Sequence, residues 1–128
     1  MAAIDDIQTH LEFLGYAIVT EGERKVATHE SKLNFLIREL GPAYILTVFF
    51  RTQDHVKAEP QVLYGVVNKL NQDSVAARFL VDGDGDLMIE AFWPNHYDRT
   101  AFAHFIEAWH HDTALLAELR EQIEGFLA

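Results

Sequence analysis

The stretch Val67–Trp93, VNKLNQDSVAARFLVDGDGDLMIEAFW, decides the fold because it reads as a helix end, a turn and a β-hairpin. On both sides of its Asp- and Gly-rich centre, residues that favour a core alternate with residues that favour the surface. This period of two is typical of half-buried strands. Asp and Gly tolerate the backbone angles of a tight turn. The segment therefore predicts two antiparallel strands that follow a helix.

The hairpin has two competing registers. A two-residue turn would set Phe79 against Glu90, an apolar ring against a charge. A three-residue loop, Gly83–Gly85, keeps apolar residues opposite each other on one face and opposite charges together on the other, and Gly85 suits the left-handed position that such a loop requires. We predict this second register, which gives the pairs Val81–Leu87, Phe79–Ile89 and Arg78–Glu90.

The tip of the hairpin resembles the start of a calcium-binding loop, because Asp82, Asp84 and Asp86 occupy every second position. A calcium loop has Gly at its sixth position and a bidentate Glu at its twelfth. This chain has Leu87 and Trp93 there, and strands rather than helices flank the run. We expect a turn and no bound metal or cofactor.

Length and composition predict one cytoplasmic domain over residues 1–128. The apolar content of 49% is that of a globular protein. No apolar run approaches the roughly 18 residues that span a bilayer, and the acidic, amphipathic N-terminus is not a targeting signal. The chain has no cysteine, which excludes disulfides, thiolate metal sites and a cysteine nucleophile.

The net charge of the chain limits the classes of partner that we expect it to bind. Twenty acidic residues against ten basic ones give a formal net charge of −10. Such a surface repels the phosphates of nucleic acids and anionic membranes, so we expect neither as a partner. The charge suits solubility, and it also suits a protein partner with a basic segment.

The N-terminal half predicts a helix and three strands. Apolar residues at helical spacing predict a helix over Ala3–Leu14, and a strand over Tyr16–Thr20 follows. The segment Arg24–Lys32 fits either an extended connector or a short helical turn. Asn34–Leu40 and Ala43–Thr52 form a hairpin around a Gly-Pro turn.

The C-terminal half predicts helices on either side of the Val67–Trp93 hairpin. A loop over Gln53–Glu59 leads to a helix that begins at Pro60, with an apolar side made of Val62, Val66, Val67 and Leu70. Asp98 caps a last helix of roughly 43 Å that continues to Leu127, with a bend possible near residues 112–113. The order is α-β-β-β-α-β-β-α, an α+β fold with an antiparallel sheet.

The chain resembles the YbjN-domain family, which has the fold of type III secretion chaperones. The resemblance is densest in Val67–Asn71, Ala77–Phe79 and Asp84–Leu87, and the order of elements extends it over nearly the whole chain. The family usually has an aromatic residue in place of Leu70. The resemblance implies a small, often dimeric, non-enzymatic module, loosely described as a sensory-transduction regulator, and it supplies no catalytic residues.

The last helix offers a weak candidate for a metal site. His104, Glu107 and His111 fall on one side of that helix, and imidazole and carboxylate groups are competent zinc ligands. His96 or Asp98 could complete the set. The alternative function is therefore a metal-dependent regulator or enzyme. A plain solvated helix face explains the same spacing, and no catalytic triad or phosphate-binding loop accompanies it.

The surplus of apolar residues gives the main candidate for a site. One face of the predicted sheet suits a helix-covered core and consists of Phe35, Ile37, Tyr44, Leu46, Val48, Phe50, Phe79 and Ile89. The other face still carries apolar residues around two arginines, namely Leu36, Leu40, Ile45, Phe49, Leu80, Met88 and Phe92. Either the last helix or a connecting segment covers this second face, or the face contacts a second copy or a protein segment. The function that we predict is a protein-binding or regulatory module, a homodimer and not an enzyme.

Overall fold

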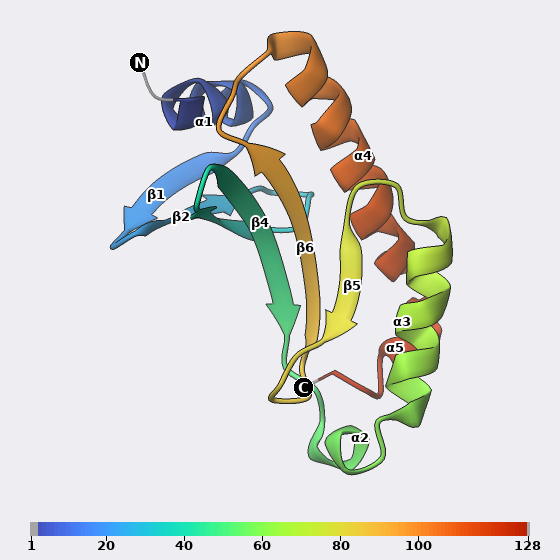
Figure 1. The fold of residues 1–128 in the computed structure, drawn as a ribbon. Helices are drawn as coiled ribbons and strands as arrows, with labels where there is room; N and C mark the ends of the chain where they lie inside the picture. The colour runs from blue at the N-terminus through green and yellow to red at the C-terminus, as the bar shows by residue number, and fades with distance from the viewer. Residues whose placement is uncertain (1–2, 128) are drawn as a thin grey trace.

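The computed structural model describes residues 3–127 of the chain (Figure 1). The first half contains α1 (Ala3–Phe13), β1 (Ala17–Glu21), β2 (Arg24–Thr28), β3 (Phe35–Leu40), β4 (Ala43–Phe50) and α2 (Asp54–Ala58). The second half contains α3 (Gln61–Asp73), β5 (Arg78–Val81), β6 (Leu87–Pro94), α4 (Arg99–Glu118) and α5 (Arg120–Ile123). None of the described helices is both long and apolar enough to span a membrane.

The six strands form one antiparallel sheet in the order β1-β2-β3-β4-β6-β5. The predicted α+β class with an antiparallel sheet is confirmed. The order has one strand more than predicted, because the ambiguous segment contains β2. Gly22, with a φ of +63°, closes a two-residue turn between β1 and β2. The sequence pattern was weak there because only Ala27 of β2 is buried.

The hairpin of β5 and β6 has the predicted three-residue loop. Phe79 lies opposite Ile89 and Arg78 opposite Glu90. The Asp82 N–H donates to the Asp86 carbonyl at 2.9 Å, and Gly85 has the expected left-handed conformation with a φ of +85°. The requirement that apolar residues pair on one face of the hairpin and opposite charges pair on the other was therefore enough to predict its register.

Three helical predictions need correction. The loop over Gln53–Glu59 contains the short helix α2. The second helix buries Val66 and Leu70 as predicted, but it buries Leu63 in place of Val62, which is exposed. The last helix has no break at residues 112–113: α4 continues to Glu118, and the separate α5 follows. Asp98 caps α4 as predicted, since its Oδ2 accepts from the Ala101 N–H at 2.8 Å.

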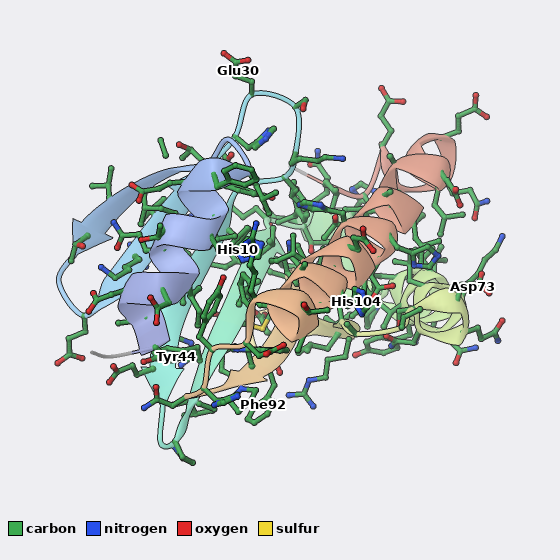
Figure 2. All side chains as sticks on the ribbon, turned by 90° about the horizontal axis from the view of Figure 1, so that it is seen from above. His10, Glu30, Tyr44, Asp73, Phe92 and His104 are labelled. Atoms are coloured by element: carbon green, nitrogen blue, oxygen red, sulfur yellow. The ribbon has the colours of Figure 1, made fainter. Side chains whose placement is uncertain are left out.

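The core lies between one face of the sheet and the helices α1, α3 and α4. Figure 2, viewed from above, shows α1 and α4 across the sheet, with His10 between them. The His10 and Phe102 rings are 5.1 Å apart, and those of Phe35 and Trp109 are 5.6 Å apart. We call this helix-covered side of the sheet the first face. All eight residues predicted for it lie in the core cluster or pack against it.

A buried carboxylate joins α4 to the connection between α3 and β5. Asp112 has no exposed surface, and its two oxygens accept three main-chain N–H groups, from Val75 at 2.8 Å and from Ala76 and Ala77 at 2.7 Å. His111 Nδ1 lies 2.9 Å from Asp112 Oδ1. One side chain thereby positions the segment that leads into β5.

Candidate functional site

The opposite side of the sheet, which we call the second face, is not covered by the helices. The register aligns its residues in rows across the strands, so that Arg38, Ile45 and Phe92 are neighbours and Leu36, Thr47 and Glu90 are neighbours. The seven apolar residues predicted for this face all lie on it, and none belongs to the core cluster or packs against it. Because α4 packs on the first face, it does not cover the second.

Six of the seven apolar residues predicted for the second face form two separate patches, and the seventh, Leu36, lies in the row between them. The Phe92 patch consists of Leu40, Ile45 and Phe92, and the Phe49 patch consists of Phe49, Leu80 and Met88. Phe92 is 59% exposed, Phe49 56% and Leu40 55%, whereas Ile45 is 7% exposed. Ile45 and Phe49 are four residues apart on β4, which is roughly 13 Å along a strand. Each patch therefore presents its own contact surface.

The row of Leu36, Thr47 and Glu90 separates the two patches, and two of its three positions are polar. Thr47 is 4% exposed, and its hydroxyl oxygen is buried without a hydrogen-bond partner. Beside it, Glu90 accepts from Arg78, whose Nε lies 2.6 Å from Glu90 Oε1. Arg38 has no carboxylate oxygen within 4.0 Å in the described part of the chain.

A groove of about 440 Å³ runs over the Phe92 patch. Arg38 and Arg78 both line it, and the connection before β5 forms one border. Its lining residues are Arg38, Leu40, Ile45, Val75, Ala76, Ala77, Arg78, Glu90, Ala91 and Phe92. The groove combines apolar side chains with two guanidinium groups, one of which is already bound to a carboxylate.

The two edge strands of the sheet, β1 and β5, differ in how much main chain they expose. The Asn71 side chain caps β5, because its amide donates to the Phe79 carbonyl at 2.9 Å and its oxygen accepts the Phe79 N–H at 2.8 Å. Asp112 binds the N–H of Ala77 just before β5. A further strand pairing at β5 would have to displace Asn71, so β1 is the more accessible edge.

The weak metal-site candidates on the last helix do not bring their ligand atoms together in this structure. His104, Glu107 and His111 are exposed on α4, and Figure 2 shows His104 at its surface. Their ligand atoms do not lie within 4.8 Å of one another, since within residues 3–127 only Asp82, Asp84 and Asp86 do so. His111 turns toward Asp112 instead. Spacing along a helix placed the three residues on one side but did not make their side chains converge.

The three aspartates of the hairpin tip serve the turn. Asp82 Oδ1 accepts the N–H groups of Asp84 at 2.9 Å and Asp86 at 3.0 Å. Asp86 accepts the Thr52 N–H at 2.9 Å and lies 3.2 Å from Lys57 Nζ. The Thr52 hydrogen bond, followed by Lys57, lowers the pKa of Asp86. The carboxylates of Asp82 and Asp86 therefore already have protein partners.

An aromatic and imidazole cluster links β1, the connection after β2 and α4. The Tyr16 hydroxyl lies 2.7 Å from His110 Nε2, and burial raises the pKa of Tyr16 to about 12. Burial also lowers the pKa of His110, as do the charges of Lys32 and His29. The pair is therefore neutral near pH 7. It borders an apolar cavity of about 430 Å³ that Leu116 and Ile123 help to line.

Sequence reasoning missed Asp112 and the Tyr16–His110 pair. Asp112 lies 35 to 37 residues from the amides that it binds, and Tyr16 lies 94 residues from His110. No local spacing signals such contacts. The only sequence-level hint is a charged residue, Asp112, on the apolar side of a helix with Phe105 and Trp109.

Comparison with known proteins supports the fold. No family model and no curated protein matches the sequence. Among solved structures, the chain superposes on YbjN of E. coli, described as a proposed transcription regulator, with a TM-score of 0.73, 12% identity, and 98% of this chain and 95% of that chain covered. The chain therefore has a YbjN-like fold. An uncharacterized protein from Methanothermobacter thermautotrophicus matches with a TM-score of 0.62, 8% identity, and 94% and 97% coverage. At these identities the likeness concerns the fold alone.

Proposed function

We propose that this YbjN-like chain is a non-enzymatic protein-binding or regulatory module whose binding surface is the second face. The observation that carries the proposal is the exposure of Phe92, Phe49 and Leu40 on a sheet face outside the core. Large exposed apolar patches on soluble proteins mark interaction surfaces. The composition and the lack of cysteine fit a cytoplasmic protein.

The size of the patches suits a modest interface. The exposed parts of two phenylalanines and a leucine amount to roughly 300 Å². A stable protein–protein interface buries about 800 Å² on each partner. The apolar patches would therefore form the centre of a contact and need polar surroundings to complete it, as in a transient complex or a bound peptide.

We assign self-association to the Phe49 patch. In a two-fold symmetric dimer the same surface meets itself, so a charged residue near the axis meets its own copy. The row of Phe49, Met88 and Leu80 carries no charge, whereas Arg38 lies beside the Phe92 patch. The Phe49 patch therefore supports a homodimer at lower electrostatic cost, and the Phe92 patch remains for another polypeptide.

Regulation, if shared with YbjN, would act through protein contacts. A net charge of −10 opposes binding to nucleic acid. The same charge would steer a partner with basic regions toward the molecule at long range. A chaperone role is a narrower version of the same proposal, because it requires a client segment on the same face.

Light scattering combined with surface variants tests the proposal. We expect the mass to rise toward that of a dimer between micromolar and near-millimolar concentration, and Phe49→Ser to abolish the rise. Val62→Ser, which removes an exposed apolar residue from α3, is the matched control and should leave the rise intact. A monomeric mass at every concentration would remove the homodimer from the proposal.

Partner binding needs its own readout. Surface-immobilised chain should retain polypeptides from a defined peptide library, and Phe92→Ser should reduce that retention while Val62→Ser does not. Equal retention by the wild type and Phe92→Ser would refute the second face as the binding surface.

A further inference from the structure

The charge of the groove over the Phe92 patch is opposite in sign to that of the whole chain. Three of the six arginines in the sequence lie on strands of this face: Arg24, Arg38 and Arg78. Only two acidic residues, Glu21 and Glu90, occupy strand positions on it. The groove itself is lined by Arg38, Arg78 and Glu90, so it is slightly positive on a chain of net charge −10, and a partner that contacts it meets this local charge at short range.

Of the two arginines that line the groove, Arg38 is the more available to a partner. Arg78 is bound to Glu90, while Arg38 is exposed and has no carboxylate within 4.0 Å in residues 3–127. Arg38 lines the groove over the Phe92 patch and also an adjacent depression, whose other charged residues are Arg24, Glu21, Glu23 and Glu39. A group bound in the groove can therefore reach its guanidinium.

We propose that the groove over the Phe92 patch binds an acidic, apolar peptide segment, with one carboxylate on Arg38 and a neighbouring apolar side chain on Ile45 and Phe92. The inference rests on the proposed protein-binding function and adds the chemistry of the partner. A guanidinium matches a carboxylate in a two-point hydrogen bond that an ammonium cannot reproduce. An apolar side chain next to that carboxylate buries the exposed ring of Phe92, so both properties of the groove are used together.

Other occupants fit the groove less well. A basic segment would place its cations beside Arg38, and the carboxylate of Glu90 is already bound to Arg78. A nucleic acid would offer several phosphates, whereas only one of the two groove arginines, Arg38, is not already bound to Glu90. A second copy in a symmetric contact would bring Arg38 toward its own copy. The net charge of the chain attracts a basic partner at long range, whereas the groove favours an acidic segment at short range. The two effects therefore predict opposite preferences for acidic and basic peptides, which a binding measurement distinguishes.

The test measures binding of three synthetic peptides by fluorescence anisotropy to the full chain. The first peptide alternates Glu with Leu and Phe, and the other two replace every Glu with Gln or with Lys. We expect the Glu peptide to bind at least tenfold more tightly than either counterpart, and its affinity to fall as salt is raised. Tighter binding of the Lys peptide would overturn the inference.

Variants then locate the contact. Arg38→Gln should weaken binding of the Glu peptide about tenfold or more, the range expected for a lost charge-assisted hydrogen bond. Arg38→Lys should recover only part of it, because it restores charge without the two-point geometry. Arg99→Gln removes an equal charge from the start of α4 and should change little. Equal losses for Arg38→Gln and Arg99→Gln would show a general charge effect and overturn the assigned contact.

The outcomes separate this inference from the proposed function. If the Lys or Gln peptide binds best and Phe92→Ser abolishes its binding, the second face binds polypeptides but the acidic segment is wrong. If no peptide binds and a dimer forms that Phe92→Ser disrupts, a second copy occupies the groove and the inference falls. If no peptide binds and neither Phe92→Ser nor Phe49→Ser alters any association, both the inference and the proposed function fail.

Discussion

Replacing Asp112 by Asn should destabilise the protein much more than the same change at a surface position. The Asp112 carboxylate is fully buried and accepts three main-chain N–H groups at 2.7–2.8 Å from the connection between α3 and β5. Asparagine has nearly the same shape and leaves no cavity, so the change tests the hydrogen bonds and the charge. It also changes one oxygen, an acceptor, into an NH₂ group, a donor.

The magnitude follows from the three bonds. The Asn oxygen can still accept the N–H groups of Ala76 and Ala77, but a hydrogen bond to a neutral acceptor is weaker than one to a charged acceptor by about 1 kcal/mol. The NH₂ group would face the Val75 N–H, a donor against a donor, although water near the exposed Val75 and the ring nitrogen of His111, 2.9 Å from the same position, relieve part of that loss. We expect a total cost of about 2–3 kcal/mol in the free energy of unfolding.

Urea unfolding of the two variants provides the assay. Asp98→Asn is the matched control on the same helix, because Asn caps a helix about as well as Asp and should cost less than about 0.5 kcal/mol. Amide hydrogen exchange should show faster exchange at Val75–Ala77 in Asp112→Asn, beyond the change in global stability. A cost below about 1 kcal/mol, or unchanged protection of these amides, would refute the assigned role of Asp112.

Three further changes test other parts of the fold. Gly85→Ala should lower the free energy of unfolding by about 1–2 kcal/mol, because it forces a side chain into the left-handed region. Gly83→Ala in the same loop should change this free energy by no more than about 0.5 kcal/mol. Equal unfolding midpoints for the two variants would contradict the loop conformation. Asn71→Ala should lower the free energy of unfolding by about 1–2 kcal/mol and expose the edge of β5 to self-association. Urea unfolding measures the first effect and light scattering the second, with Asn68→Ala on the same helix as the control. The pKa of His110 is lower in the folded than in the unfolded chain, so the folded state binds fewer protons and its stability should fall as the pH drops through about 6.5 toward the lower folded pKa. In His110→Gln this part of the pH dependence of unfolding should disappear, and an unchanged slope would show that burial does not shift the titration.

The hairpin of β5 and β6 could be predicted because its information is local. Every pair across the hairpin lies within a short stretch of chain, and only one register keeps Phe79 opposite Ile89 and Arg78 opposite Glu90. β2 gave no such signal, because a strand near the edge of the sheet with one buried residue has little apolar alternation to detect. Local pattern therefore predicts buried hairpins better than exposed edge strands.

The composition of the second face could be predicted, but its division into two patches could not. Alternation along each strand placed Ile45, Phe49 and Phe92 on one side of the sheet. Their distances depend on the register between β4 and β6, which are separated by α2, α3 and β5 in the sequence. That register puts the Thr47 and Glu90 row between the apolar groups. A long-range pairing of this kind has no turn to fix it and needs the assembled fold.

The charge that we infer for the partner also depends on how the strands are paired, and not on composition alone. A count of acidic and basic residues favours a basic partner, because the count averages over the whole surface. The sheet instead brings Arg24 and Arg38 opposite each other on neighbouring strands, although they are 14 residues apart in the chain. At contact distance a partner interacts with the residues it touches, while the remaining charges are screened beyond about 10 Å.

The exposed apolar surface of the second face also favours aggregation, and the arginines of this face oppose it. A sheet with helices on one side exposes its other side to stacking with further copies, and edge strands add a route to aggregation. In this fold Asn71 caps the β5 edge, and charged side chains interrupt the apolar surface at Arg38 and at the pair of Arg78 and Glu90. Replacing Arg38 by a neutral residue therefore separates two roles. If Arg38 only limits stacking, Arg38→Gln should increase self-association without changing peptide affinity; if it binds a carboxylate, affinity for the acidic peptide should fall at concentrations where the chain is still monomeric.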